Sequence, residues 1–288
     1  MAPEGASRCR AVASGLQDRS AALSRSPYEK RAENRCRPLP RQPPCFAKPH
    51  HRNMYSGSRM SRYYNGPVSD HFNGERFFDP FGVPPRSQRD LMRWHLERRS
   101  ARAKWPRWAP SPYADRPPQR VEAGMRISYI GHASFLVQTA GLNILLDPVW
   151  SDRASPFRFV GPKRVNAPGI VFADLPPIDV VLVSHAHYDH LDVATLSRLA
   201  DAHRPRFITA LGNDTIMRKH DRAIAAEAYD WRDRVEVGGG VAVILVPARH
   251  WSARTLSDRN MSLWASFVLE TPAGKVYFVA DSGYGEGR

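Results

Sequence analysis

The sequence predicts an α/β fold for residues 121–288. Short apolar runs rich in β-branched residues recur through this part of the chain, two segments with helical spacing lie between them, and turn residues join several of the runs. Many strands with intermittent helices are typical of a layered architecture, in which sheets bury their apolar faces against helices or other sheets. We therefore expect one layered α/β domain here.

The elements of this domain can be assigned in chain order. Residues 126–138 and 143–150 flank the sequence TAGL and are predicted to form a hairpin. Next come a buried strand at 178–184, a short helix at 193–203, a strand at 204–211 and a turn or helix at 213–220. Three further strands are predicted at 241–250, 263–271 and 275–283. The last two strands are expected to be joined through PAGK.

The first 120 residues differ in composition from the rest of the chain. They carry 24 Lys and Arg against 10 Asp and Glu, whereas residues 121–288 carry 18 of each, so the formal charge of +14 arises in the first part. Arg, Pro, Ser and Ala dominate residues 1–53, which we expect to be a disordered basic extension. Residues 54–120 are predicted to be an N-terminal arm that contains a helix.

The helix of this arm is predicted over residues 87–105, with Ser87 as N-cap and Leu91, Trp94 and Leu96 among its apolar positions. It can pack as an amphipathic helix on the main domain. Alternatively it makes a peripheral membrane contact, with Arg and Lys at lipid headgroups and Trp below them. No nucleic-acid partner is expected, because no recognised binding motif accompanies the basic charge.

Cysteine use and hydropathy favour a cytoplasmic location. Cys9, Cys36 and Cys45 have no CxxC spacing, and an odd, scattered set gives neither a thiolate metal site nor a disulfide framework. No run of 18 apolar residues predicts a membrane-spanning helix, and the basic start lacks the apolar region of a signal peptide. We expect a protein of the reducing cytoplasm.

The densest group of chemically active residues lies in VLVSHAHYDHLD, residues 181–192. Side chains two apart in an extended segment point the same way, so His185 and His187 can face one metal ion. Asp189 and His190 follow where the chain turns into the next helix, and can serve a second position. Imidazole and carboxylate are the ligands of zinc, with iron or manganese as alternatives, and such groups are costly after a buried strand unless something binds them.

Two later strands end in residues that can complete this site. The strand 241–250 ends at His250, and the strand that begins at Lys275 runs to Asp281. Sites in α/β sheets tend to form at the carboxyl ends of strands, so three strands can deliver ligands to one place. A surface histidine at His250 and an Asp turn before Gly283 are the alternatives.

Three further residues are weaker candidates. His132 follows a strand, and either contacts substrate, supports a ligand or packs. Asp147 ends another strand, and Asp192 follows the ligand run. Either aspartate can accept a hydrogen bond from a ligand imidazole and so tune metal affinity, and helix capping is the alternative for Asp192.

These residues resemble those of a known family. H-x-H-x-D-H after a buried strand, with a later His and Asp on strand ends, resembles the metallo-β-lactamase superfamily. Longer segments are similar to its branch of N-acyl-phosphatidylethanolamine-hydrolysing phospholipase D (NAPE-PLD) and bacterial relatives, from about Arg62 to the C-terminus: YYNGPVSDHF, YIGHASFLVQTAGLNILLDPVWSDRASPFRFVGPKR, SHAHYDHLD, RHWSARTLSDRNMSLWASF and VYFVADSGYG. The resemblance implies an αββα sandwich with two zinc ions between its sheets.

The resemblance also implies roles for individual residues. The first metal ion would be held by His185, His187 and His250. The second would be held by Asp189 and His190, and Asp281 would bridge the two ions. The family has a further histidine ligand well after the bridging aspartate, but no His follows His250 and the sequence stops at Arg288. We therefore expect a C-terminally truncated or frameshifted domain whose second metal lacks a ligand, unless a partner supplies the missing part.

The activity implied is hydrolysis of a phosphodiester, on a phospholipid-like substrate, by metal-bound hydroxide. Zinc lowers the pKa of bound water to about 7, and Asp189 and Asp281 would be the catalytic residues that hold and orient the nucleophile. Ester, lactone or thioester hydrolysis on the same site is the second hypothesis. The third is an inactive remnant that lacks the last metal ligand.

Overall fold

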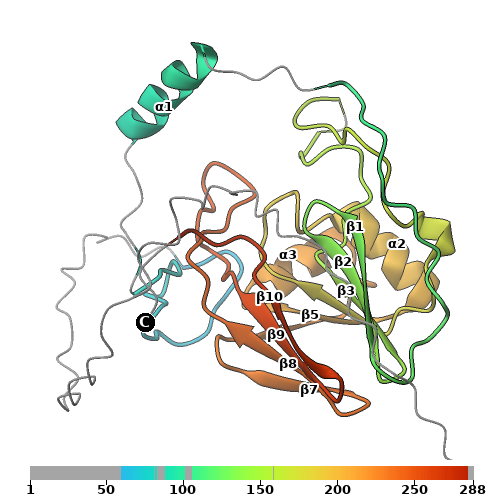
Figure 1. The fold of residues 1–288 in the computed structure, drawn as a ribbon. Helices are drawn as coiled ribbons and strands as arrows, with labels where there is room; N and C mark the ends of the chain where they lie inside the picture. The colour runs from blue at the N-terminus through green and yellow to red at the C-terminus, as the bar shows by residue number, and fades with distance from the viewer. Residues whose placement is uncertain (1–59, 81, 83–87, 101–105, 158, 285–288) are drawn as a thin grey trace, which may run out of the picture. The chain divides into compact units, whose positions relative to one another are not determined.

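The computed structural model describes residues 60–80, 82, 88–100, 106–157 and 159–284 (Figure 1). The predicted basic extension lies outside these residues, as do all three cysteines. The elements are, in chain order, α1 (Gln88–Ser100), β1 (Met125–Gly131), β2 (Ser134–Thr139), β3 (Leu142–Leu146), a 3-10 helix (Phe172–Asp174), β4 (Val180–Val183), α2 (Val193–His203), β5 (Arg206–Ala210), α3 (Asn213–His220), β6 (Ala226–Tyr229), β7 (Arg234–Gly238), β8 (Val241–Val246), β9 (Ser266–Thr271) and β10 (Gly274–Phe278).

The first sheet has the order β1-β2-β3-β4-β5-β6. Its first three strands are antiparallel, and β2 meets β3 through a tight turn in which Ala140 and Gly141 both have positive φ. From β3 to β6 the strands are parallel, because helical segments between them return the chain to the starting edge of the sheet. The carboxyl ends of β3, β4 and β5 therefore lie at one edge.

The second sheet has the order β10-β9-β8-β7 and is antiparallel throughout. Its inner face is apolar, with side chains such as Val243, Leu245 and Phe267 fully buried. Charged residues, including Arg234 and Glu236, are exposed on β7, and an ion pair joins Arg234 to Glu270 of β9. Apolar residues on one face and charged residues on the other are typical of an antiparallel sheet with one face exposed to solvent.

The two sheets and the helices α2 and α3 form layers around two cores. Val180 and Leu182 of β4 point toward the second sheet, whereas Val181 and Val183 point toward the helices. Both faces of the first sheet are thus covered, which explains why β4 is apolar at every position. Figure 1 shows α2 and α3 on the side of the first sheet away from β7–β10. The predicted layered α/β sandwich is confirmed.

Within residues 61–80 of the arm, Phe72 and Phe77 belong to the core between the sheets. Phe72 and Phe77 are each 1% exposed and lie in the same cluster as Trp231 and Trp264. Ser61 Oγ donates to the carbonyl of Met261 at 2.9 Å, across 200 residues of sequence. The boundaries predicted for the arm and the domain stay predictions, but this part of the arm packs as one body with both sheets.

Most of the predicted elements are confirmed, with four corrections. The segment 126–138 is not one strand, because the chain turns after Gly131 and pairs β1 with β2. The strand predicted over 143–150 ends at Leu146, and the strands β8 and β10 likewise end early, at Val246 and Phe278, before His250 and Asp281. The strand predicted to begin at 263 starts at Ser266. The short strands β6 and β7 were missed, since their residues are mostly small or charged and show no long apolar run.

The helix α1 confirms the predicted arm helix over residues 88–100, while Ser87 and residues 101–105 lie outside the described part of the chain. Met92, Trp94 and Leu96 are 67%, 45% and 63% exposed. Among the described residues, no helix has the length and apolar character needed to cross a membrane.

Candidate metal centre

The loop after β4 carries four of the predicted site residues. The strand β4 ends at Val183. The next two residues, Ser184 and His185, are still buried, and the chain then turns through Tyr188 before α2 begins at Val193. A backbone hydrogen bond from the nitrogen of Leu191 to the carbonyl of His187 closes the turn at 2.8 Å. The loop therefore presents its histidines at the carboxyl edge of the first sheet.

His250 and Asp281 reach the same place from the second sheet. The backbone nitrogen of Arg249 donates to Ser282 Oγ at 3.1 Å, and that of Gly283 donates to the carbonyl of Arg249 at 2.7 Å. These bonds join the segment after β8 to the segment after β10, and so place His250 beside Asp281. Nε2 of His250 lies 3.6 Å from Oδ2 of Asp281.

A first group of possible metal ligands consists of His185, His187, His250 and Asp281, with one donor atom from each lying within 4.8 Å of all the others. His187 Nδ1 is 2.8 Å from Nε2 of His185 and 3.1 Å from Nε2 of His250. The structure therefore brings together, from both sheets, the three histidines that the resemblance assigned to one metal ion.

A second group consists of His132, Asp189 and His190, again with one donor atom each within 4.8 Å of the others. Oδ2 of Asp189 is 3.1 Å from Nε2 of His132. Nε2 of His190 lies 3.3 Å from Oδ1 of Asp281. Asp281 thus touches residues of both groups, which is the placement expected of a bridging carboxylate.

Asp147, which is fully buried just after β3, holds His190 in place. Its Oδ2 accepts from Nδ1 of His190 at 2.7 Å and from Oγ of Ser184 at 2.6 Å, while Oδ1 accepts from the nitrogen of Ser184 at 2.7 Å. A carboxylate on Nδ1 fixes the ring so that Nε2 points toward the second group. The hydrogen bond from His190 is the contact expected if Asp147 supports a ligand imidazole.

Asp192 has a different role. Its carboxylate caps the first turn of α2, where Oδ2 accepts from Oγ1 of Thr195 at 2.6 Å, and it also accepts from the nitrogen of Ser151 at 2.9 Å. Its hydrogen bonds in the described part of the chain go to these neighbours and to Trp150, not to a candidate ligand. The capping alternative is therefore the one that the structure shows.

Sequence reasoning missed the side chains that brace the loop. Nη1 of Arg254 donates to the carbonyls of Ala186 and Leu191, at 2.9 and 2.8 Å, and its guanidinium lies 4.0 Å above the ring of Tyr188. Ser252 Oγ accepts from the nitrogen of Ala186 at 3.2 Å. Both residues occur in the segment RHWSARTL, but nothing in their spacing indicated the contact with a loop more than 60 positions earlier.

Burial sets the protonation of the first group. Removal from water lowers the pKa of His185 well below its usual value, and lowers that of His187 to about 4, with the neighbouring histidines adding to the effect. The pKa of His250 is also lowered, mainly by burial. These imidazoles are neutral near pH 7, and a neutral imidazole offers a lone pair to a cation.

The second group combines charges. Burial opposes ionisation of Asp189, but the hydrogen bond to His132 and the charge of His190 lower its pKa to about 2. Burial also opposes a charge on His190, yet the carboxylates of Asp147 and Asp281 raise its pKa to about 10. A cation bound here would take the place of that proton.

The donor atoms suit a metal ion. Nε2 of His187 and Nε2 of His190 are buried nitrogen atoms without a hydrogen-bond partner among the described residues. A buried polar atom left unpaired costs about 1–3 kcal/mol, and a cation held by the second group would give Nε2 of His190 a partner. Neutral imidazoles and carboxylates are the ligand set of zinc, iron and manganese.

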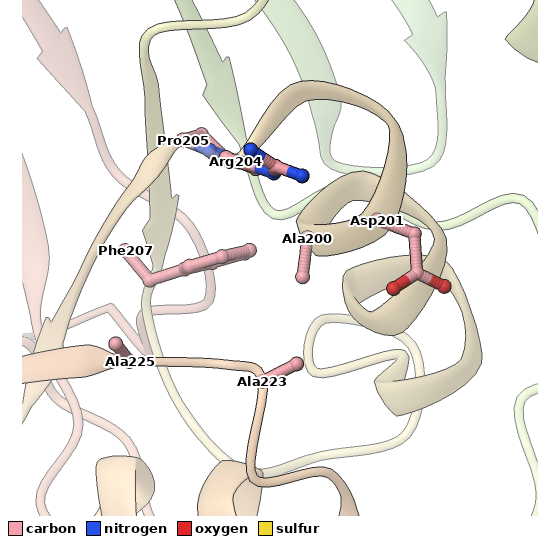
Figure 2. A pocket seen from close by; sticks show the side chains of 7 residues that line it. All are labelled: Ala200, Asp201, Arg204, Pro205, Phe207, Ala223 and Ala225. Carbon is pink, nitrogen blue, oxygen red and sulfur yellow. The ribbon is translucent and has the colours of Figure 1, made fainter.

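Two hollows border the site. One, of about 540 Å³, runs from His132 and Asp281 along Phe135, Tyr277 and Phe278, and most of its lining is apolar. The other, of about 970 Å³, is lined in part by Tyr188 and Asp192 of the loop and by basic residues such as Lys219. A third cavity of about 380 Å³, between α2, β5 and the segment 221–225, contains none of the candidate ligands (Figure 2).

The fold and the site together define a layered α/β protein with two adjacent His/Asp groups, suited to metal ions, at the end of its sheets. Residues 142–288, just over half of the chain, match the β-lactamase superfamily domain. The chain belongs to this superfamily. The match includes the loop 185–190, His250 and Asp281, and begins after His132.

Several curated relatives share this region. An uncharacterized protein of Mycobacterium tuberculosis is 39% identical over 204 residues, which cover 69% of this chain and 53% of that protein. An N-acyl-phosphatidylethanolamine-hydrolyzing phospholipase D of Caenorhabditis elegans is 33% identical over 57% of this chain and 48% of its own. A metal-dependent hydrolase of Opitutus terrae is 31% identical over 55% and 63%. The chain spans about half the length of the first two.

Proposed function

We propose that this chain is a zinc-dependent hydrolase that cleaves a phosphodiester of a phospholipid-like substrate. The observation that carries the proposal is the pair of His/Asp groups that meet at Asp281, with His190 on one side and His250 on the other. Such adjacent groups suit two metal ions that bind the oxygens of one substrate. Iron and manganese are the alternative metals.

The residues of the chain supply charge and position. Bound metal ions would lower the pKa of water and neutralise charge that develops on the phosphoryl oxygens. Asp189 is ionised at neutral pH, so it can accept a hydrogen bond from the attacking water and orient it. Asp281, whose pKa is lowered chiefly by its contact with His190, is also an anion and can orient the same water.

Similarity to the phospholipase D of Caenorhabditis elegans supports the choice of substrate. The hollow that starts at His132 and Asp281 supports it independently, because its apolar lining can accept an apolar part of a substrate whose polar group lies at the metal centre. A lactone, ester or thioester would fit the same centre, so we treat these as outcomes of the test.

The test is turnover by the full, zinc-loaded chain. It is offered vesicles containing an N-acyl-phosphatidylethanolamine, and separately a nitrophenyl phosphodiester, a lactone and a thioester. We expect cleavage of both phosphodiesters and loss of that activity in Asp189→Asn, which keeps the size of the side chain but removes its charge. Preference for the lactone or thioester would replace the phosphodiesterase assignment, and no turnover with metal bound would favour a non-catalytic protein.

A cytoplasmic protein that contacts membranes peripherally fits this proposal. Met92, Trp94 and Leu96 are exposed on α1, whose sequence QRDLMRWHLERRS also contains four arginines, and apolar, Trp and basic residues together suit a lipid surface. Sedimentation with anionic vesicles, compared between the full chain and Trp94→Ser, measures the contact. Equal binding of both proteins would argue against a role for α1.

A further inference from the structure

We propose that His132 is a metal ligand, so that the second group holds its ion through His132, Asp189 and His190. The proposal rests on the metal dependence proposed above, and it concerns binding rather than turnover. The family match begins after His132, so this residue joins the site from the turn between β1 and β2, which precedes the matched segment.

The geometry of the group is that of three ligands around one point. The donor atoms of His132, Asp189 and His190 lie within 4.8 Å of one another, and Nε2 of His132 is 3.1 Å from Oδ2 of Asp189. The rings of His132 and His190 are 5.2 Å apart and inclined at 66°, so they approach from different directions. Two imidazoles and a carboxylate make a three-ligand site that leaves one position open, as catalytic zinc sites do.

The buried member of the group, His190, has a ring nitrogen that a cation could bind. His190 is 0% exposed, its Nδ1 is committed to Asp147, and its Nε2 has no hydrogen-bond partner in the described part of the chain. That nitrogen points into the group and lies 3.3 Å from Asp281. A metal ion between His190, Asp189 and His132 would give it the partner that it lacks.

The turn between β1 and β2 holds His132 over the group. His132 has φ 51°, a left-handed conformation that is uncommon outside glycine, and it follows Gly131 at the end of β1. Ser134, two residues later, donates through Oγ to the carbonyl of Asp147 at 2.6 Å and accepts from the nitrogen of Val149 at 3.1 Å. The segment that orients His190 is therefore tied to the turn that positions His132.

Two other roles for His132 must be separated from this one. Packing does not account for it, because its side chain is 53% exposed. A histidine that only donates a hydrogen bond to Asp189, or only contacts substrate, would occupy the same place. These roles differ in one respect: only a ligand is required for the second ion to bind in the absence of substrate.

The experiment compares zinc binding by the metal-depleted full chain and three variants, by calorimetry and by the absorption spectrum of bound cobalt. His132→Ala removes the imidazole. His132→Gln keeps an N–H that can donate to Asp189 but offers no imidazole nitrogen. His220→Ala is the matched control, because it removes an exposed imidazole of α3 that lies outside both groups. Circular dichroism verifies that each variant is folded.

We expect two zinc ions per chain in the parent and in His220→Ala. In His132→Ala and His132→Gln the first ion should bind normally, while the second binds at least about 100-fold more weakly and its cobalt spectrum is lost, because a direct ligand should cost more than the 10–100-fold typical of an outer hydrogen bond. Unchanged binding of both ions by His132→Gln, or a single ion in the parent chain, would overturn the assignment. Two bound ions without hydrolysis would refute the proposed activity and leave this ligand in place.

Discussion

Two buried histidines of this protein, His71 and His190, each lie between two carboxylates, but they differ in whether both ring nitrogens have a hydrogen-bond partner. His71 is 3% exposed, and its Nδ1 and Nε2 bond to Asp70 at 2.6 Å and to Asp230 at 2.8 Å. Its ring also stacks on Trp231 at 4.5 Å. His190 bonds to Asp147 through Nδ1, but its buried Nε2 has no hydrogen-bond partner among the described residues.

This difference separates a structural histidine from a candidate ligand. Every polar atom of the His71 ring is satisfied by the protein, so the residue joins the arm to the segment between β6 and β7 and has no capacity for a further partner. The His190 ring has one satisfied nitrogen that fixes its orientation and one unsatisfied nitrogen that faces other donors. Both histidines are buried, which opposes a charge, and both have carboxylate neighbours that raise the pKa above its usual value, so these properties alone do not distinguish the two.

Removal of ligands should give the largest effect. We expect His185→Ala and Asp189→Ala to lower the hydrolytic rate by on the order of 10³-fold or more, since each loses a group that holds the metal or the attacking water. Their helix content by circular dichroism should stay close to that of the parent. Parental activity in either variant would contradict the site.

A smaller loss is expected when the support of His190 is weakened. Asp147→Asn keeps the size of the side chain but removes the carboxylate that fixes Nδ1 of His190, so zinc affinity should fall by about 10–100-fold. Asp192→Asn is the control, because Asp192 caps α2 and bonds to no candidate ligand in the described structure. Equal zinc affinity in Asp147→Asn and the parent, by calorimetry, would remove Asp147 from the metal centre.

His71→Phe should affect stability and leave metal binding unchanged. The variant keeps an aromatic ring on Trp231 but deprives Asp230 of its hydrogen bond, which should lower the free energy of unfolding by about 1–3 kcal/mol. Urea denaturation measures the loss, and zinc titration provides the comparison with Asp147→Asn. A drop in zinc affinity in His71→Phe would break the proposed distinction between the two histidines.

The smallest expected effect is the pH dependence of the stability lost in His71→Phe. Burial opposes a charge on His71, but the hydrogen bonds to Asp230 and Asp70 raise its pKa above the usual 6.5. The proton therefore binds more tightly to the folded chain, and its stabilisation is complete below about pH 6.5 and lost as the pH rises through the raised value. The stability difference between the parent and His71→Phe should accordingly be larger at pH 6 than at pH 9, and a constant difference would show that His71 does not act through its charge.

The strands and helices with a strong local pattern could be predicted from the sequence. The apolar run of β4 and the helical spacing of α2 are properties of neighbouring residues, and both elements were found where predicted. The strand β7 was not predicted, because its alternation of charged and apolar residues extends over only five residues and contains no apolar run. Only the pairing with β8 reveals it as part of a sheet.

The candidate site was predictable where its members are adjacent in sequence. His185, His187, Asp189 and His190 stand within six positions, so their spacing alone indicated a metal site. His132 was predicted to contact substrate, support a ligand or pack, since its proximity to Asp189 depends on a turn 57 residues earlier in the chain. His71 was missed for the same reason, as its partner Asp230 lies 159 residues away.

The contact of Ser61 with Met261 has a consequence for how the protein is made. Residues of the arm are synthesised long before the residues that they contact: Ser61 bonds to Met261, Tyr63 bonds to Asp258 and Phe72 packs in the cluster that includes Trp264. Contacts that close loops of this length form slowly, because their entropy must be lost before they stabilise anything. Phe72 and Phe77 therefore remain without their final cover until more than 180 further residues have been added, and a nascent chain in that interval presents apolar surface to chaperones.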